Sequence, residues 1–327
     1  MTSESGSSLF ERRLVIVSGK GGTGKTSVAA ALALGAARAG RRVLVAEVGP
    51  DEHLPGLLEP GAAPVGYAGR ELLPGLTSMR VDPYDALGEY LALQLGAGPL
   101  IRMVLRNRGF RQLMDASPGW RELITLGKVW HLGEQRDASG QPLYDLIVVD
   151  APATGHGITL LDVPRVVVSA VRAGPLRRHT SRVEAMLRDP DHTLLLPVAL
   201  AEELPARETA EFVARVRQEI GIPVDRVVVN AVMPAPYPPG LENLEAKLAR
   251  LPDTCLEGVL PRPSVLAASV AHLRARHELN RRYVEEIGAS TELPVIELPY
   301  LMTGTQGREP LQQLGEALVA PPRVVAA

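Results

Sequence analysis

Short aliphatic runs separated by polar segments rich in glycine and proline set the pattern of this chain. Leu14 to Val17 is such a run; a glycine-rich segment follows it, and then an alanine-rich stretch, Lys25 to Arg38, of strong helix formers. This order predicts a strand, a loop and a helix. Comparable runs, each a predicted strand, are Val43 to Val45, Leu146 to Val149, Leu194 to Val198, Val227 to Val229 and Val295 to Leu298, with Leu76 to Val81 as a further candidate.

The predicted strands are nearly continuous in hydrophobicity and do not alternate between apolar and polar residues. Such runs are typical of parallel strands that helices bury on both faces. We therefore predict an α/β fold with a doubly wound, mostly parallel sheet of about seven or eight strands.

Two stretches interrupt the alternation of strands and helices. Between Asp85 and Gln135 the apolar residues have helical spacing, which predicts a helical insertion. A second helical insertion is expected between Pro164 and Pro190. The run Val166 to Val168 inside it is compatible with a strand or a helix, and we favour a helix.

Composition narrows the class of protein. The chain has 327 residues, of which 46% are hydrophobic, enough for one large or two ordinary domains. We expect one domain over residues 12–318, with flexible tails at 1–11 and 318–327. Because 35 basic residues face 37 acidic ones, the net charge is −2, and no global positive field favours nucleic acid. We expect no nucleic-acid partner.

The single cysteine, Cys255, excludes an internal disulfide framework and a cysteine-ligated metal cluster within one chain. We expect it to be a buried, inert thiol. The first residues, MTSESGSSLFERR, lack the basic start and apolar core of a signal peptide. The longest apolar stretch near them, Val28 to Ala37, is about half as long as a membrane span. We therefore expect a cytoplasmic protein without an integral membrane segment.

A phosphate-binding loop stands between the first predicted strand and the first predicted helix. Residues 19–26 satisfy the pattern G-x-x-x-x-G-K-[ST]. Its glycines allow backbone N–H groups to face a phosphate, the side chain of Lys25 reaches the terminal phosphates of a nucleotide, and the Thr26 hydroxyl ligates Mg2+. The alternative is a chance match in a glycine-rich turn, which the flanking strand and helix disfavour. The predicted nucleotide-binding residues here are Gly19, Lys20, Gly21, Gly22, Thr23, Gly24, Lys25, Thr26 and Ser27.

Lysine usage supports the loop. The chain has 31 arginines and four lysines, and two of the lysines, Lys20 and Lys25, fall inside the loop. A compact ammonium group fits between phosphate oxygens where a planar guanidinium would crowd them.

The position of Lys20, directly after the first glycine, resembles the deviant loop of the ATPase group that includes MinD, ParA, nitrogenase reductase and ArsA. In that group two protomers close over two nucleotides, and the early lysine reaches the partner's phosphates. The resemblance implies that Lys20 is a catalytic residue supplied in trans, so that charge neutralisation depends on dimerisation. It also implies ATP and Mg2+ as ligands and a homodimer or a heterodimer with a paralogue.

The segment from Asp150 to His156 follows a predicted strand and resembles the switch II signature D-T-A-P-T-G-H of the ArsA/GET-type ATPases. Asp150 stands at the carboxyl end of its strand, where it would face the Mg2+ position. The resemblance implies that Asp150 is a metal ligand together with Thr26. It suggests a switch role for His156, which could instead be a hydrogen-bonded structural histidine.

Three further stretches are similar to this family. Ala201-Glu202-Glu203-Leu204 with Glu208-Thr209 resembles a segment whose first glutamate, here Glu202, contacts nucleotide. Asn230 corresponds to an asparagine that contacts adenine, and Pro299 and Leu301 belong to a loop beside the adenine. Two of these residues have ordinary alternatives. Glu202 could be a solvated helix-cap carboxylate, and Asn230 could be a turn residue.

The chain departs from the family at one catalytic position. Members usually carry S-T-D-P-A-H after the second strand, where the aspartate orients the attacking water, and aligning the proline places Gly49 at that position. Glu47 and Asp51 are the available substitutes. Glu47 could instead serve only the Mg2+ shell, and Asp51 could be an ordinary loop acid. We therefore expect ATP hydrolysis that is slow.

The resemblance thus suggests a dimeric, ATP-hydrolysing switch that couples its Mg-ATP state to a hydrophobic or acidic protein client through the helical insertions. Packing with a solvated basic face is the other interpretation of the first insertion. With one cysteine, the chain lacks the zinc-binding CxxC pair and the metalloid-binding cysteines of other branches. Two alternatives stay open. One is a nucleotide-binding regulatory subunit that pairs with an active paralogue, suggested by Gly49. The other is a MinD/ParA-like positioning ATPase, which the lack of a basic amphipathic helix in Gln312 to Ala327 disfavours.

Overall fold

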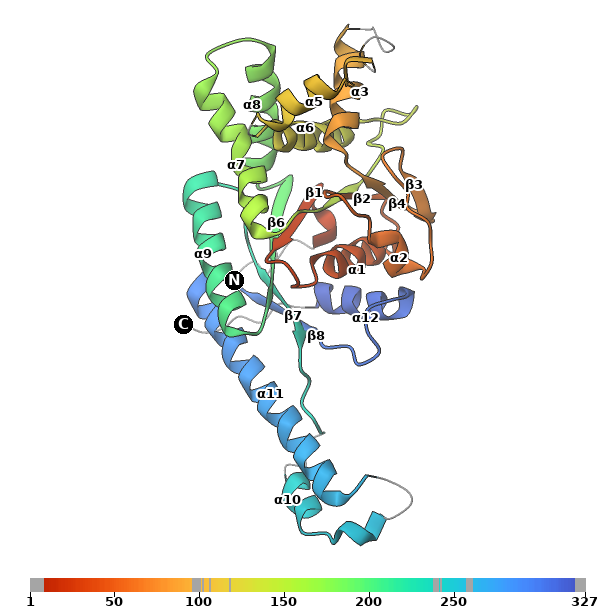
Figure 1. Ribbon diagram of the computed structural model, residues 1–327, viewed down its shortest axis with the longest axis vertical. Helices are drawn as coiled ribbons and strands as arrows, with labels where there is room; N and C mark the ends of the chain where they lie inside the picture. The colour runs from red at the N-terminus through yellow and green to blue at the C-terminus, as the bar shows by residue number, and fades with distance from the viewer. Residues whose placement is uncertain are drawn as a thin grey trace, which may run out of the picture.

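The centre of the molecule is an eight-stranded sheet (Figure 1). The computed structural model describes residues 9–95, 101, 103–105, 107–117, 119–237, 241, 243–256 and 261–320. The strand order is β3-β4-β2-β5-β1-β6-β7-β8, and every neighbouring pair is parallel except β3 and β4. The strands are β1 (Leu14–Gly19), β2 (Val43–Glu47), β3 (Arg70–Leu73), β4 (Leu76–Arg80), β5 (Leu146–Asp150), β6 (Thr193–Leu200), β7 (Val227–Val232) and β8 (Val295–Pro299). The predicted doubly wound, mostly parallel sheet is confirmed.

Helices cover both faces of the sheet. One face packs against α1 (Lys25–Arg38), α2 (Leu54–Leu58) and α12 (Arg308–Val319). The other packs against α6 (Trp120–Glu134), α7 (Thr154–Ala170), α8 (Pro175–Arg188), α9 (Glu203–Arg215) and α11 (Pro263–Thr291). Successive residues of β1 alternate between the two cores: Leu14 and Ile16 enter one, and Val15 and Val17 enter the other. This double burial explains why the strands read as continuous apolar runs.

One strand was not predicted. β3 forms an antiparallel hairpin with β4 through the turn at Pro74 and Gly75, and it is the edge strand of the sheet. Its first two residues, Arg70 and Glu71, are exposed, so β3 lacks the apolar run by which the other strands were recognised.

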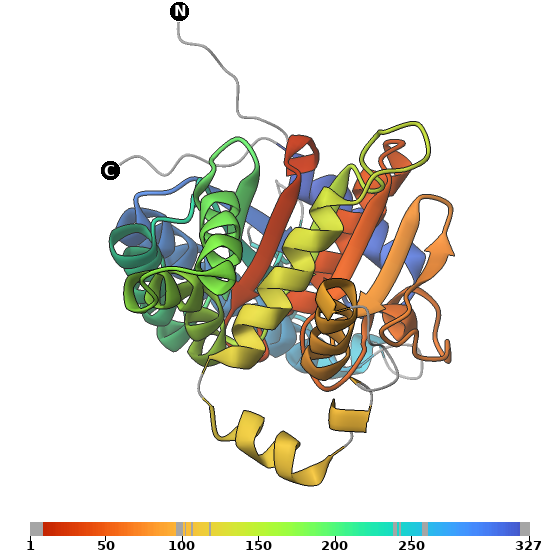
Figure 2. The ribbon, with the colours of Figure 1, turned by 90° about the horizontal axis from the view of Figure 1, so that it is seen from above.

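The first helical insertion lies over the carboxyl side of the sheet and contains α3 (Pro83–Leu95), α5 (Arg108–Asp115) and α6. It has a small core of its own, formed by Leu87, Ile101 and Leu105. Figure 2 shows α6 lying in front of the sheet and running roughly along the strands, whereas α5 projects beyond the body. In the second expected insertion, Val166 to Val168 is helical, as predicted, and belongs to α7. Pro164 lies inside α7 and does not begin a separate element.

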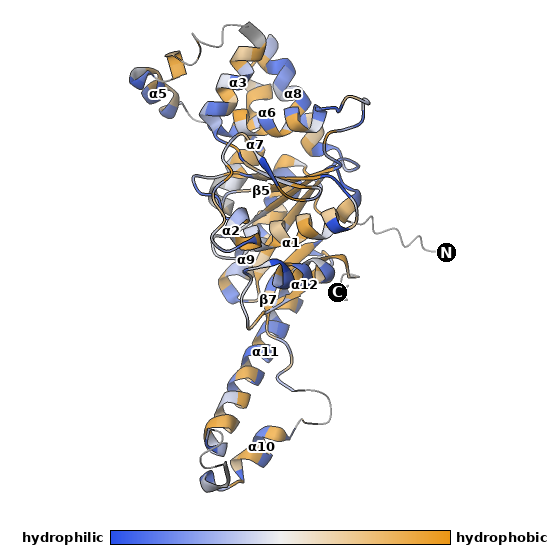
Figure 3. Ribbon diagram, turned by 90° about the vertical axis from the view of Figure 1, so that its right-hand side faces the viewer, coloured by the Kyte–Doolittle hydropathy of each residue, from blue (hydrophilic) through white to orange (hydrophobic). Residues whose placement is uncertain are grey.

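An arm that the sequence did not predict projects from the opposite side of the body (Figure 1). It consists of the first half of α11, α10 (Leu244–Ala249) and the 3-10 turn η3 (Asp253–Leu256). Within that half of α11 only Pro263 and Ala267 are buried, and Figure 3 shows hydrophobic and hydrophilic residues mixed along it. Its base is held by Asn280, whose side chain accepts a hydrogen bond from Met233 N at 2.8 Å and donates one to Ala201 O at 3.0 Å.

Secondary structure extends into both segments that were expected to be flexible tails. The 3-10 turn η1 (Leu9–Glu11) buries Leu9, which is 2% exposed. α12 continues to Val319 and buries Leu318 against the core. The apolar residues of both segments explain the difference, because they fill space beside α1. Residues 1–8 and 321–327 lie outside the described residues.

The remaining short helix, η2 (Val216–Ile220), continues α9 with π-type geometry. None of the described helices combines the length and the apolar character that a membrane span requires.

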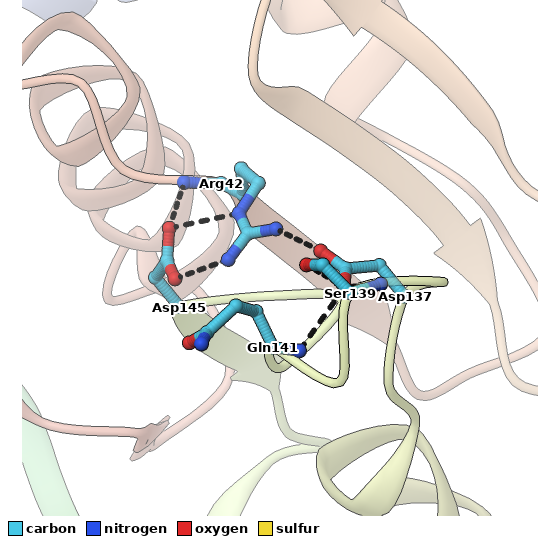
Figure 4. Close-up of polar contacts among 5 residues, drawn as sticks. All are labelled: Arg42, Asp137, Ser139, Gln141 and Asp145. Carbon is cyan, nitrogen blue, oxygen red and sulfur yellow. Dashed lines mark hydrogen bonds and ion pairs between the residues drawn. The ribbon is translucent and has the colours of Figure 1, made fainter.

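A polar cluster joins the amino ends of β2 and β5 (Figure 4). The Arg42 guanidinium donates to Asp145 through Nη2 at 2.9 Å and Nε at 3.2 Å, and to Asp137 through Nη1 at 3.1 Å. Asp137 also accepts backbone N–H groups of Ser139 at 2.9 Å and Gln141 at 3.0 Å. The hydrogen bonds from Arg42 hold the pKa of Asp145 below its ordinary value. The cluster fixes the loop that leads into β5.

Candidate functional site

The glycine-rich loop connects the end of β1 with the start of α1 and requires glycine at two positions for steric reasons. A Cβ on Gly19 would stand 2.2 Å from Val198 O of β6. Gly24 has φ 85°, and a Cβ there would stand 2.2 Å from Asn230 Nδ2. Because only glycine accepts both constraints, the loop can run between the strand ends with its backbone close to them.

The two lysines of the loop point to different surroundings. Lys25 Nζ donates to Lys20 O at 3.2 Å, and burial lowers the pKa of Lys25, although the charge of Asp150 opposes the shift. The Lys20 side chain is 45% exposed and forms an ion pair with Glu208 of α9. One ammonium group therefore lies inside the site, and the other faces the surface of the same protomer.

Asp150 and Thr26 form the candidate Mg2+ site. Thr26 Oγ1 donates to Asp150 Oδ2 at 2.6 Å, whereas Asp150 Oδ1 is buried and has no hydrogen-bond partner within the described structure. Burial raises the pKa of Asp150, and the Thr26 hydrogen bond and the Lys25 charge only partly offset this. A hydroxyl and an unsatisfied carboxylate are oxygen ligands that suit Mg2+.

In the part of the chain that is described, no group of three or more His, Cys, Asp or Glu residues could hold a metal by itself. Mg2+ is usually held by one or two carboxylates together with substrate phosphates and water, so the Asp150 and Thr26 pair fits this ion.

Glu47 stands beside Asp150, because the two residues are paired in register at the carboxyl ends of β2 and β5. Its side chain is buried, and its Oε2 accepts the backbone N–H groups of His53 at 2.7 Å and Leu54 at 3.1 Å. Burial raises the pKa of Glu47, partly offset by these two hydrogen bonds. Glu47 thereby holds the start of α2 and the loop before it in place.

A cavity of about 210 Å³ gathers the predicted catalytic and metal-binding groups. Lys25, Thr26, Glu47, Asp51 and Asp150 all line it. Asp51 is exposed at its rim and belongs to the loop that Glu47 anchors. Gly49 also lines this cavity.

The predicted base-side residue Asn230 lies under the phosphate loop. It is 8% exposed, and its Nδ2 donates to Thr23 O at 2.9 Å. The next residue, Ala231, has φ 55°, and the pairing of β7 with β8 shifts register there. This bulge turns the strand end so that Asn230 faces the loop.

The remaining predicted nucleotide contacts surround the same end of the sheet. Ser27 Oγ lies 3.4 Å from Thr305 Oγ1, which brings the loop after β8 to the start of α1. Pro299 pairs in register with Val232, and Leu301 packs on the core beside α1. Glu202 immediately precedes α9, its side chain is exposed, and it makes no helix-capping hydrogen bond.

Two residues near the site were not predicted as functional. Glu208 appears in a motif quoted above, but its pairing with Lys20 spans 188 positions and has no local signal. His53 lines the cavity beside Glu47, and its interaction with Asp150 is one of the smaller effects that oppose the rise in the pKa of Asp150. The side chains of His156 and Cys255 are outside the described part of the structure, so their predicted roles stay predictions.

A phosphate loop between β1 and α1, with an aspartate at the end of a neighbouring strand, defines a P-loop ATPase of the doubly wound class. Comparisons with known proteins agree. Residues 12–174 match the family model described as anion-transporting ATPase. The chain is 30% identical over 324 residues to ATPase BagA of Mycobacterium tuberculosis, covering 94% of this chain and 92% of that protein. The chain therefore belongs to the ArsA-type ATPase family.

More distant relatives are arsenical pump-driving ATPases. The Escherichia coli protein is 29% identical over 246 residues, which covers 66% of this chain and 39% of that protein. The Acidiphilium multivorum protein is 28% identical over 236 residues with the same coverage. Family membership supports ATP binding and ATP hydrolysis by this chain.

Proposed function

We propose that this ATPase is a dimeric switch, in which Mg-ATP joins two protomers and changes how the helical insertions hold a protein partner. The observation that carries the proposal is that two lysines of the same loop point in different directions. Lys25 points into the cavity, whereas Lys20 of the same loop faces outward and is engaged by Glu208. An ammonium group directed away from its own site is available to another protomer's phosphates, as in the deviant loops that this sequence resembles.

In this proposal the loop holds the triphosphate of ATP. Backbone N–H groups of residues 19–24 and the Lys25 ammonium neutralise phosphate charge, and the side chains of Ser27 and Asn230 face the remainder of the nucleotide. Thr26 and Asp150 would hold Mg2+, which supplies positive charge to the terminal phosphates when bound. Asp150 Oδ1, which has no partner among the described residues, supports this assignment.

Closure of the dimer requires Lys20 to leave Glu208. The pair is half-exposed, with side-chain exposures of 45% and 27%, so the energetic cost of separating the two charges is small. Glu208 Oε2 is buried without a described partner, which leaves the carboxylate only partly satisfied. We assign Glu208 the role of holding Lys20 in its own protomer until a second nucleotide site is presented.

Asp51 is the stronger candidate for orienting the attacking water. Glu47 Oε2 accepts two backbone N–H groups of the neighbouring loop, and its Oε1 lies 3.5 Å from Ser78 Oγ. No hydrogen bond to the Asp51 side chain restrains it among the described residues. A carboxylate without hydrogen bonds to hold it positions water less well than a fixed one, which supports slow hydrolysis.

The partner would bind at the first helical insertion. Its exposed apolar side chains include Met103 at 69%, Leu113 at 66% and Leu93 at 64% exposure, and α5 buries none of its residues. Apolar side chains grouped on projecting helices are typical of a protein-binding surface. α7 begins shortly after Asp150 and packs against α6, so it connects the metal site with the insertion. A hydrophobic segment of a client protein fits this surface.

A second candidate function is a nucleotide-binding subunit that pairs with an active paralogue. It is favoured by Gly49, which removes the usual water-orienting carboxylate from the cavity, together with the engagement of Glu47 elsewhere.

Complementation between two inactive variants tests the switch. We expect Lys25→Ala and Lys20→Ala each to abolish steady-state ATP hydrolysis by the purified protein. A 1:1 mixture should regain about a quarter of the wild-type rate, because random pairing makes half of the dimers mixed, each with one complete site. Lysines that act in cis would give no recovery.

Glu208→Gln serves as the matched variant. It should keep hydrolysis and lower the protein concentration at which ATP produces dimers in sedimentation velocity. Tight ATP binding without turnover, restored only by adding a different chain, would instead support the regulatory subunit.

A further inference from the structure

A second cavity lies between the two helical insertions, with walls supplied by α3, α6 and α8. Its volume is about 150 Å³. The apolar residues that line it are Leu93, Leu123, Ile124, Trp130, Leu176 and Val183. At its mouth Leu93 and Leu176 are 64% and 48% exposed, so the cavity opens to solvent between two helices that belong to different insertions.

Aromatic rings form one wall of this cavity. His179 meets Tyr90 edge to face with ring centroids 5.6 Å apart, and it meets Trp130 at 6.3 Å. All three residues line the cavity. Such a wall offers ring faces and edges to a flat ligand, because aromatic pairs favour edge-to-face and offset contacts.

The charged groups of the cavity compensate each other. Lys128 Nζ donates to both carboxylate oxygens of Glu89, at 2.9 and 2.7 Å, and it lies 5.0 Å from the centre of the Tyr67 ring. Tyr67 also donates its hydroxyl to Glu89. His131 also lines the cavity, and its Nε2 lies 3.8 Å from Glu89 Oε1. Lys128 and His131 therefore both face Glu89, and neither is left over to neutralise an ionic ligand.

One polar group of the lining is left without a partner. Thr180 is 1% exposed, and its Oγ1 makes no hydrogen bond within the described structure. Buried hydroxyl groups in proteins are nearly always hydrogen-bonded, so a ligand hydroxyl at this position would satisfy Thr180.

We propose that this cavity is a binding site for an uncharged molecule of about one ring in size that carries a hydroxyl group, that is, a ligand of the phenol class. The size agrees with cavities of about 150 Å³ that take up benzene. The paired charges exclude an ionic ligand, and Thr180 supplies the hydrogen bond to the hydroxyl. The proposal does not depend on the dimer or the nucleotide, and it shares one residue, Leu93, with the surface proposed above for the protein partner.

Calorimetric titration of the full-length protein tests the site with phenol, toluene and benzoate as probes. Phenol should bind best, because toluene lacks the hydroxyl and benzoate brings an uncompensated charge. Thr180→Val removes the hydroxyl but keeps the shape of the side chain. It should weaken phenol binding about fivefold and leave toluene binding unchanged. It should also melt no lower than the wild type, because it removes an unsatisfied buried group.

Gly127 of α6 supplies a second variant. It lines the cavity, and a Cβ added there meets no atom within 4 Å, so Gly127→Leu should fill the space and abolish binding of phenol and toluene. Gly133→Ala in the same helix, outside the cavity lining, should leave binding unchanged and controls for helix propensity. Phenol that does not bind the wild type, or that binds Gly127→Leu equally well, would overturn the proposal. So would binding of benzoate as tight as that of phenol.

Discussion

The two ends of the strand pair β2 and β5 differ in how their charges are satisfied. At the amino ends, opposite charges meet: Arg42 donates to Asp145 and Asp137 in the cluster of Figure 4. At the carboxyl ends, two carboxylates stand side by side, because Glu47 and Asp150 are paired in register. Both are buried, and Asp150 Oδ1 has no partner within the described structure.

The pKa values shift in opposite directions at the two ends. Hydrogen bonds from Arg42 lower the pKa of Asp145, whereas burial raises the pKa of Asp150. A satisfied cluster stabilises the fold, while an unsatisfied one costs stability and is retained where a ligand completes it. The amino ends of β2 and β5 therefore carry charges that stabilise the fold, whereas their carboxyl ends carry the charges of the candidate nucleotide site.

The largest effect should follow from removing the charge of Asp150. Asp150→Asn should lower steady-state ATP hydrolysis on the order of 1000-fold, because the predicted metal ligand is lost. The same change should raise the free energy of unfolding of the nucleotide-free protein by about 1 kcal/mol, since it removes a buried, incompletely paired charge. Urea denaturation without Mg2+ measures the second quantity. An Asp150→Asn variant that is less stable and fully active would show that Asp150 stabilises the fold and does not serve the nucleotide site.

The next largest effect should separate the two acidic substitutes. Asp51→Asn should reduce kcat about 100-fold if its carboxylate orients water. Glu47→Gln keeps an acceptor for the backbone of His53 and Leu54, so kcat should stay within about threefold of the wild-type value. A large loss in Glu47→Gln with little change in Asp51→Asn, measured in single-turnover assays, would assign the role to Glu47 instead.

Arg42→Ala should act on stability alone. Without the guanidinium, Asp145 and Asp137 lose their cation, and the melting temperature should fall measurably. The nucleotide site lies at the other end of the strands, so ATP affinity measured by fluorescence titration should change less than about twofold. A large loss of ATP affinity in Arg42→Ala would show that the two edges are coupled.

The smallest effect concerns pH and His192, which precedes β6 at the amino edge and whose carbonyl accepts Arg13 N and Leu14 N. Burial, reinforced by the charge of Arg13, lowers the pKa of His192 from 6.5. The unfolded chain therefore binds the proton more readily than the folded protein does. The contribution of His192 to stability is present above pH 6.5 and lost as the pH falls through the lowered pKa. Denaturant midpoints between neutral and acidic pH should fall more steeply for the wild type than for His192→Gln.

Much of this architecture could be predicted because its signals are local. Aliphatic runs such as Leu146 to Val149 identify strands that are buried on both faces. The two glycines that the loop requires for steric reasons, Gly19 and Gly24, both belong to the motif G-x-x-x-x-G-K-[ST]. Lys25, Thr26 and Asp150 were expected at one site, and the structure brings them to one cavity.

What was missed depends on distant contacts or on weak patterns. The arm was missed because the first half of α11 buries only Pro263 and Ala267 and so makes few of the core contacts that the other helices make. β3 is short and exposed. The engagement of Lys20 by Glu208 and the hydrogen bonds of Glu47 to the start of α2 arise only when the folded chain brings these groups together.

The strand order of the sheet also determines when each strand can find its neighbours during translation. β1 lies in the middle, with Leu14 opposite both Ile147 and Thr193, and α12 closes over α1 so tightly that a Cβ on Gly315 would stand 2.8 Å from Ala31 O. During translation, the first strand and the apolar helix behind it must wait for partners made much later. A nascent chain that lacks α12 therefore exposes the apolar face of α1, which makes it prone to aggregation.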